Sequence, residues 1–261
     1  MTDLTLLTGG TGTLGSRTLP LLRAAGVPVR VLSRGEHPAA DGVEYVTGDL
    51  TTGDGIEAAL DGVHTVVHCA GAQSGDEDKA RVLVKAASAA DVRHIVNISV
   101  VGAERIPVNG AMDKAMFGYF AMKLATEQVI ADSGVPWTTL RATQFHTLVL
   151  TVARAMAKLP VVPVPTGFVV QPVDADDVAQ RLTELALGEP AGLVDDIAGP
   201  TVYRMADLIR GYLAATGTKR PLLPIRLPGR AAKAFRAGGN VAPDHATGKR
   251  SWEEFLAANT P

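Results

Sequence analysis

The sequence has few of the features that mark secreted, membrane-spanning or nucleic-acid-binding proteins. It contains one cysteine, Cys69, among 261 residues, so no disulfide can form within the chain, as is usual in a reducing compartment. The 25 basic and 27 acidic residues leave a net charge of −2, which does not favour nucleic acid or an anionic membrane as a partner. No apolar run approaches the roughly 18 residues that span a bilayer, and no signal segment opens the chain. We therefore expect a cytoplasmic protein that binds neither nucleic acid nor a membrane.

Strand-like and helix-like segments alternate along the first 142 residues. Strands are expected at residues 4–8, 29–32, 44–46, 65–68, 94–99 and 137–141, and helices at 14–25, 76–90 and 117–132. Short apolar strands separated by helices are typical of a parallel sheet covered on both faces, which right-handed crossovers make doubly wound. The sequence thus predicts an α/β fold with a Rossmann core over residues 1–142. A smaller substrate lobe is expected at 143–261, packed on the same core as one structural unit.

A glycine-rich loop follows the first expected strand and opens the first expected helix. It reads Thr8-Gly9-Gly10-Thr11-Gly12-Thr13-Leu14-Gly15 and fits both G-x-G-x-x-G and G-x-x-G-x-x-G. Glycine lets the backbone approach a pyrophosphate, and the helix start offers free N–H groups to it. No lysine of a P-loop nucleotidase follows, so a dinucleotide is favoured over ATP, the alternative being a turn without a ligand. The residues expected to contact the dinucleotide are Gly9, Thr11, Gly12, Thr13, Leu14 and Gly15.

The end of the second expected strand indicates which dinucleotide is bound. An NAD site usually carries an acidic residue there for the ribose hydroxyls, whereas this chain has Ser33 and Arg34. A serine hydroxyl and a guanidinium can both bind the additional phosphate of NADP. The sequence therefore favours NADP, with NAD less favoured. The preference would reverse if Arg34 were a surface charge and Glu36 turned toward the ribose.

Two further strand ends complete the expected cofactor site. Asp49 and Leu50 follow the third strand, where the aspartate can accept a hydrogen bond from the adenine amino group or cap a helix. Cys69, Ala70 and Gly71 follow the fourth strand and are small enough for the cofactor to lie close. We interpret Cys69 as a small core residue, not as a nucleophile.

A tyrosine and a lysine four residues apart suggest the chemistry. Tyr119 and Lys123 fall on one expected helix and so share a face. Carbonyl reduction needs a proton donor near the hydride donor, and an ammonium group beside a phenol favours proton release. Ser99, at the end of the fifth strand, can hold the substrate oxygen that becomes anionic. In the alternative interpretation Tyr119 packs in the core and Lys123 pairs with Glu127.

These motifs together resemble the short-chain dehydrogenase/reductase superfamily. Lys123 to Phe145, Gln171 to Ala179 and the closing Ser251-Trp252-Glu253-Glu254-Phe255-Leu256 resemble its atypical, NmrA-like or NAD(P)H-binding branch. The resemblance implies a Rossmann domain with NADP in its groove and a small C-terminal substrate lobe. It also implies Tyr119 as acid and base, Lys123 as ribose anchor and Ser99 as polarising group. The chain departs from the branch where Ala142 replaces a proline that often follows the sixth strand.

Residues of the later chain complete the prediction. Thr143, Gln144 and Phe145 follow the sixth strand, where the crevice of such a sheet receives the nicotinamide and the substrate; a plain loop is the alternative. His146 is expected to support the site without acting as a base, and no cluster has the spacing of metal ligands, so no metal is expected. Seven basic residues and no acidic one lie between Leu208 and Pro243, which indicates a solvated face or an attraction for anions.

The sequence thus favours an NADP-dependent oxidoreductase that acts on a small, largely apolar carbonyl, alcohol or quinone. Two other classes remain open. One is a non-catalytic NADP(H) sensor of the NmrA type, and the other is an isomerase or epimerase that retains NAD(P). The pattern leaves a monomer and a homodimer equally possible.

Overall fold

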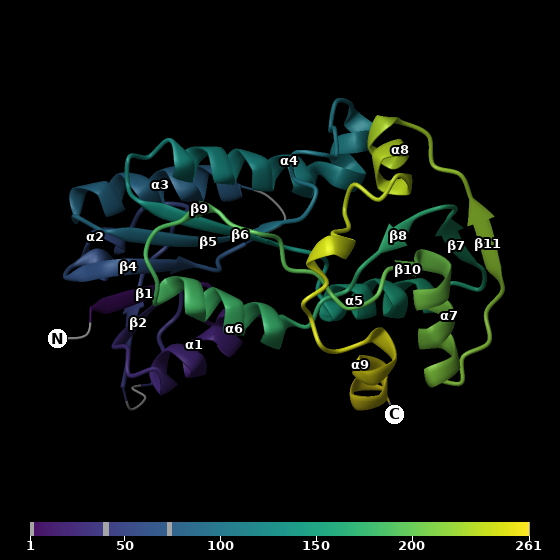
Figure 1. Ribbon diagram of the computed structural model, residues 1–261, viewed down its shortest axis with the longest axis horizontal. Helices are drawn as coiled ribbons and strands as arrows, with labels where there is room; N and C mark the ends of the chain where they lie inside the picture. Colours follow the sequence, from purple (N-terminus) through teal and green to yellow (C-terminus); the bar gives the residue numbers. More distant parts are fainter. Residues whose placement is uncertain (1–2, 39–41, 72–74, 261) are drawn as a thin grey trace. The chain divides into compact units, whose positions relative to one another are not determined.

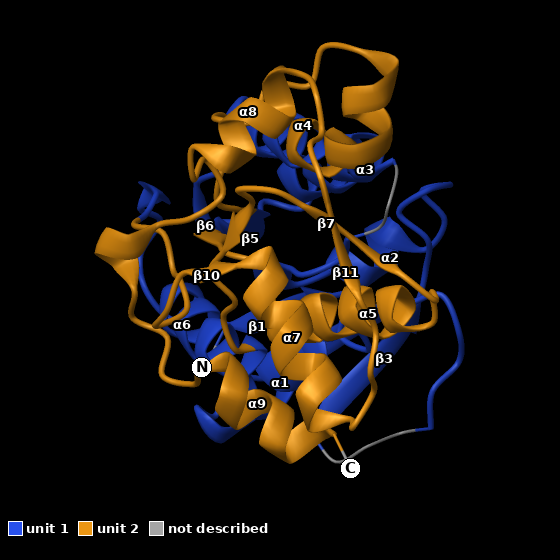
Figure 2. Cartoon of the chain, turned by 90° about the vertical axis from the view of Figure 1, so that its right-hand side faces the viewer, with its two compact units in different colours: residues 1–99, 122–140, 175–194 blue, residues 100–121, 141–174, 195–261 orange. Residues whose placement is uncertain are grey.

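The computed structural model describes residues 3–38, 42–71 and 75–260, which fold as two compact units (Figure 2). Unit 1 comprises residues 1–99, 122–140 and 175–194, and unit 2 comprises residues 100–121, 141–174 and 195–261. Each unit is therefore assembled from three separate stretches of chain. No helix of the described residues is both long and apolar enough to cross a membrane.

A seven-stranded sheet organises unit 1, in the order β3-β2-β1-β4-β5-β6-β9 (Figure 1). The strands are β1 (Leu4–Thr8), β2 (Val29–Ser33), β3 (Val43–Thr47), β4 (Val63–His68), β5 (His94–Val100), β6 (Trp137–Ala142) and β9 (Gly192–Leu193). The pairs β1–β2, β2–β3, β1–β4, β4–β5 and β6–β9 are parallel. Successive strands are added on one side of β1 up to β3 and on its other side from β4 onward. This change in strand order creates a crevice at the carboxyl ends of β1 and β4. This order confirms the predicted doubly wound Rossmann sheet.

Helices cover both faces of this sheet (Figure 1). The helices α1 (Gly15–Ala24) and α6 (Ala175–Ala186) pack together on one face, and α2 (Ile56–Leu60), α3 (Asp76–Ala89) and α4 (Ala111–Ala131) lie on the other. Leu6, Val66 and Ile95 are buried in the sheet and contact Leu83 of α3 and Ile130 of α4 in one apolar cluster. Burial on both faces explains why these strands read as continuous apolar runs.

Unit 2 contains the other helices and four short strands. They are β7 (Val162–Pro165), β8 (Val169–Val170), β10 (Tyr203–Arg204), β11 (Leu222–Ile225), α5 (His146–Ala157), α7 (Met205–Ala215), α8 (Arg230–Arg236) and α9 (Trp252–Asn259), with a short 3-10 turn at Pro243–His245. β7 pairs with β11 in parallel, and β8 with β10 antiparallel. Ser251 caps α9 through a capping box with Glu254, which orients the buried ring of Trp252.

The structure adds elements that the sequence pattern did not predict. Helix α4 starts at Ala111, six residues before the predicted start, and the short α2, β8, β9, β10 and β11 had no predicted counterpart. Segments of two to five residues carry too little periodicity to be recognised in a sequence. The division into a core of 1–142 and a lobe of 143–261 stays a prediction.

Candidate functional site

The glycine loop between β1 and α1 is packed too tightly for side chains at two of its positions. Gly9 has a φ of +68°, and a Cβ placed on it would lie 2.7 Å from the backbone nitrogen of Ala70. A Cβ on Gly15 would overlap the carbonyl oxygen of Gly9. The turn is closed by a hydrogen bond of 2.9 Å that the Gly12 amide donates to the Gly9 carbonyl. The backbone is therefore bare at the start of α1, as a bound pyrophosphate requires.

A cavity of about 460 Å³ lies against this loop, within the usual size range of ligand pockets. It is lined from the carboxyl ends of β1, β2, β3 and β4, the edge where a doubly wound sheet binds its ligand. Ten predicted cofactor residues line it: Gly9, Thr11, Gly12, Ser33, Arg34, Asp49, Leu50, Cys69, Ala70 and Gly71. Thr8, Leu32, Gly35, Gly48, Thr51 and Lys79 also line it and were not predicted. Thr13, Leu14 and Gly15 stand next to this lining, at the start of α1.

Ser33 and Arg34 occupy one end of the cavity, at the end of β2. Ser33 Oγ lies 2.7 Å from His37 Nε2 and accepts a hydrogen bond of 3.3 Å from the Gly35 amide. The His37 ring stacks on Tyr45, with 4.8 Å between the ring centroids. Arg34 is exposed and lines the cavity, so its guanidinium can turn toward a phosphate bound there. Glu36, the alternative ribose contact, is exposed and lies outside the cavity lining.

Asp49 forms a local turn at the end of β3. Its Oδ1 accepts a hydrogen bond of 2.8 Å from the Thr51 amide, the Asx turn that this residue type favours. This bond, with Thr51 also contacting the side chain, holds the pKa of Asp49 below its ordinary value. The residue that precedes α2 is Gly55, so Asp49 is not that helix's cap. Asp49 is part of the cavity lining, where a carboxylate can accept hydrogen bonds from a ligand.

A buried polar network joins β1 and β4 beside the cavity, whose lining includes Thr8 and Ala70. Thr8 Oγ1 accepts a hydrogen bond of 3.3 Å from the Ala70 amide and lies 2.8 Å from His68 Nδ1. Burial, with smaller contributions from Lys123 and Lys79, lowers the pKa of His68 to about 3, so its ring is neutral at physiological pH. Burial likewise raises the pKa of the Cys69 thiol to about 12. A thiol that stays protonated is a poor nucleophile.

Lys123, on α4, is buried and only 4% exposed. Its Nζ lies 3.3 Å from Oδ2 of Asp76, the first residue of α3. A Cβ placed on Gly71 would lie 3.4 Å from the same Nζ, so the ammonium group stands directly behind the cavity wall. The structure thus pairs Lys123 with a buried carboxylate of another helix.

The other predicted catalytic residues fall in both units. Ser99, in unit 1, is buried near the end of β5, and its Oγ has no hydrogen-bond partner within the described part of the chain. Tyr119 lies one helical turn before Lys123 on α4, belongs to unit 2 and is 45% exposed. The phenol is therefore not a core side chain.

Thr143, Gln144 and Phe145 lie in unit 2, between β6 and α5. Asn240, which the sequence did not single out, is fully buried and donates a hydrogen bond of 3.4 Å to Gln144 Oε1. His146 is buried in a stack with Trp252 and Phe255, at centroid distances of 6.0 and 4.8 Å. The stack is a packing arrangement, and the supporting role of this histidine stays a prediction. Among the described residues no group of three or more His, Cys, Asp or Glu side chains could hold a metal ion.

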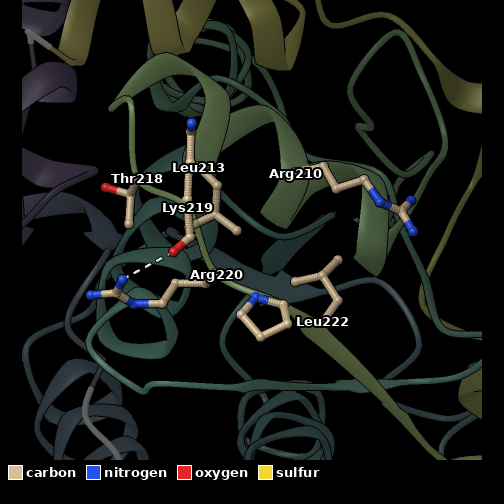
Figure 3. Close-up of a pocket in the computed structure, with 7 residues that line it drawn as sticks. Arg210, Leu213, Thr218, Lys219, Arg220 and Leu222 are labelled. Atoms are coloured by element: carbon tan, nitrogen blue, oxygen red, sulfur yellow. Dashed lines mark hydrogen bonds between the residues drawn. The ribbon is translucent and has the colours of Figure 1, made fainter.

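Unit 2 has an open depression of about 480 Å³, lined by Arg210, Leu213, Thr218, Lys219, Arg220, Pro221 and Leu222 (Figure 3). It belongs to the basic segment noted in the sequence. Arg210 pairs with Asp207 at 2.6 Å, and Arg220 donates a hydrogen bond of 3.0 Å to the Lys219 carbonyl. These cations are thus held by protein groups, and the depression lacks a glycine loop. The cavity beside β1 remains the candidate cofactor site.

A doubly wound parallel sheet with a bare glycine loop and a cavity at its carboxyl edge defines a dinucleotide-binding Rossmann protein. Residues 9–187 match a family model described as NAD(P)H-binding. The match spans well over half of the chain, which therefore belongs to this NAD(P)H-binding family. This confirms the resemblance that the sequence motifs carried.

Several known proteins are similar to this chain. The NAD(P)H azoreductase of Xenophilus azovorans is 28% identical over 240 residues, which cover 89% of this chain and 80% of that protein. The photosystem II assembly factor Ycf39 of Trieres chinensis is 25% identical over 257 residues, covering 91% and 78%. The crystal structure of the NADPH-dependent quinone oxidoreductase QOR2 from Escherichia coli, complexed with NADPH, aligns with a TM-score of 0.80 over 98% of this chain and 99% of that one. Because that identity is only 20%, the likeness concerns the fold.

Proposed function

We propose that this chain is an NADPH-dependent oxidoreductase that transfers hydride between the nicotinamide and a small, largely apolar carbonyl, alcohol or quinone. The observation that carries the proposal is the cavity in unit 1, which brings the glycine loop and the cations Arg34 and Lys79 to one space. An anionic dinucleotide fits this combination of bare backbone and positive charge. Membership of the NAD(P)H-binding family and the azoreductase relative support reduction as the activity.

Different residues bind different parts of the cofactor. The glycine loop binds the pyrophosphate, Ser33 and Arg34 bind the 2′-phosphate, and the loops at Asp49 and at Cys69 enclose the adenosine. Thr143, Gln144 and Phe145 serve the nicotinamide end. When bound, the cofactor supplies the hydride, and the chain has to supply a proton and hold the substrate oxygen.

Three residues carry these steps. Tyr119 donates the proton to the substrate oxygen, and the Ser99 hydroxyl donates a hydrogen bond to that same oxygen. A buried hydroxyl without a partner, as found for Ser99 among the described residues, is uncommon and fits a group that serves a ligand. Lys123 binds the ribose and favours proton release from Tyr119, since an ammonium group stabilises a nearby phenolate.

The surface of α4 before Tyr119 supports an apolar substrate. Met116 and Met112, one and two turns upstream on the same helical face, are 49% and 62% exposed. Methionine is flexible and polarizable and packs well against flat aromatic molecules. Exposed methionines in this place favour a flat, apolar substrate such as a quinone.

The proposal is tested by measuring NADPH and NADH binding by fluorescence. NADPH consumption is then measured with panels of quinones, other carbonyl compounds and azo compounds. Tyr119→Phe is expected to lower kcat by about 100-fold or more, the usual worth of a general acid, while the Kd for NADPH stays the same. Tyr212→Phe, on α7, is the matched control and should retain full turnover. Unchanged kcat in Tyr119→Phe would refute the proton-donor role, and absence of binding to either nucleotide would refute the function.

A second candidate function is cofactor binding without turnover. The observation that favours it is the similarity to a relative named for assembly of a photosystem and not for a reaction. A protein of this kind would bind NADPH and consume none of it with any member of the substrate panels. The same experiment therefore separates the two candidates.

A further inference from the structure

Asp76 is a buried carboxylate that has no role in the reaction proposed above. It is the first residue of α3, and its side chain is 1% exposed. Aspartate is rarely buried to this degree unless it is paired, because removing the charge from water is costly. The preceding Gly75 has a φ of +76°, so the chain turns sharply into the helix at this point.

The two oxygens of Asp76 face two ammonium groups from different helices. Oδ2 lies 3.3 Å from Lys123 Nζ on α4, and Oδ1 lies 3.6 Å from Lys79 Nζ one turn further along α3. Lys79 lines the cavity. The carboxylate therefore bridges a cation in the cavity wall and a cation buried behind it.

Gly71 joins this bridge to the cavity. A Cβ placed on Gly71 would lie 3.4 Å from Lys123 Nζ and 3.6 Å from Asp76 Oδ2. Gly71 is itself part of the cavity lining. The ion pair thus lies next to the backbone that forms the wall of the cavity.

We propose that Asp76 is a positioning residue of the cofactor site, which holds the ammonium groups of Lys79 and Lys123 at the cavity wall for the hydroxyl and phosphate groups of the dinucleotide. This inference rests on the proposed function, since it takes Lys123 as a cofactor contact. A lysine has four rotatable side-chain bonds and a compact, strongly hydrated charge. Without a fixed carboxylate its ammonium group loses a defined place, and ligand binding must then pay for ordering it.

The test compares NADPH affinity in Asp76→Asn, Asp76→Glu, Lys123→Met and the double variant Asp76→Asn/Lys123→Met. Asp78→Asn is the matched control, because Asp78 lies in the same helical turn and is exposed. We expect Asp76→Asn to weaken NADPH binding about tenfold, as for the loss of a charge-assisted contact. Asp76→Glu, which keeps the carboxylate, should recover part of that affinity, and Asp78→Asn should bind as the parent does.

The double variant separates positioning from general support of the fold. If Asp76 acts through the two lysines, Asp76→Asn weakens NADPH binding less in the Lys123→Met background than in the parent, because only the effect through Lys79 remains there. Losses that multiply fully, or an Asp76→Asn variant that is folded and binds NADPH as tightly as the parent, would overturn the inference. If Asp76→Asn does not fold, Asp76→Glu decides, since its change in affinity must be smaller in the Lys123→Met background than in the parent. A parent protein that binds no nucleotide would instead refute the proposed function.

Discussion

At the scale of single residues, Cys69 shows that a cysteine beside a cofactor cavity need not be reactive. Burial raises the pKa of its thiol to about 12, so the reactive thiolate is scarce near neutral pH. Since the chain has one cysteine, alkylation by iodoacetamide near neutral pH reports on this thiol alone. We expect very slow labelling of the folded protein and rapid labelling in denaturant, as followed by mass spectrometry. Rapid labelling of the folded form would contradict the protonated state.

Arg34 is expected to determine the choice between the two pyridine nucleotides. Arg34→Leu removes a guanidinium at the end of β2 that can bind the 2′-phosphate of NADPH, a group that NADH lacks. We predict NADPH binding at least about tenfold weaker, with little change for NADH, measured by fluorescence titration. Arg93→Leu, exposed at the amino end of β5, should affect neither nucleotide. Equal losses for both nucleotides would show that Arg34 does not read the phosphate.

At the scale of elements, the junction of β1 and α1 tolerates almost no added volume. In Gly15→Ala the new methyl group would overlap the Gly9 carbonyl, a rigid backbone atom. We expect the free energy of unfolding to fall by about 1–3 kcal/mol, as for other overpacked sites, and NADPH binding to be lost. Gly118→Ala is the contrasting control, because that helical glycine has open space around it and alanine should stabilise α4 by up to about 1 kcal/mol. Urea unfolding of both variants measures whether the free energy of unfolding falls in Gly15→Ala and rises in Gly118→Ala.

Long elements and the glycine loop could be predicted from the sequence, and most of the cavity lining followed from them. The strand ends at Ser33, Asp49 and Cys69 were predictable because a parallel sheet gathers all its carboxyl ends at one edge. Lys79 and Asp76 were not, because a lysine three residues after an aspartate is common on any exposed helix. Only the folded chain shows that Asp76 is buried beside Lys123 of α4. Asn240 was also missed, because it lies in a loop without a recognisable motif or hydrophobic periodicity.

At the scale of the whole molecule, the buried ring of His68 makes stability depend on pH. Its pKa is about 3 in the folded chain and near 6.5 in an unfolded chain. Between these values unfolding takes up one proton, so the free energy of unfolding falls by up to about 1.4 kcal/mol for each unit that the pH drops. Above the unfolded value the residue makes no such contribution.

His68→Gln should remove this dependence, because glutamine does not titrate and can still accept a hydrogen bond from Thr8. Urea unfolding of the parent and the variant from roughly pH 7 to roughly pH 4 measures the difference in slope. His37→Gln, at an exposed position, should keep the slope of the parent. Identical slopes for His68→Gln and the parent would contradict the buried neutral ring.

The way in which the chain alternates between its two units restricts how such a protein can be recombined. Helix α1, which follows the glycine loop, packs on α6, and Arg17 pairs with Asp176 at 2.9 Å, although some 160 residues separate them in the chain. Unit 2 is likewise built from residues 100–121, 141–174 and 195–261. A single crossover between homologous genes would therefore divide at least one unit between the two parents, and a crossover between residues 100 and 194 would divide both. Exchange of a whole unit between two homologues therefore requires several crossovers, because neither unit is one continuous stretch of the chain.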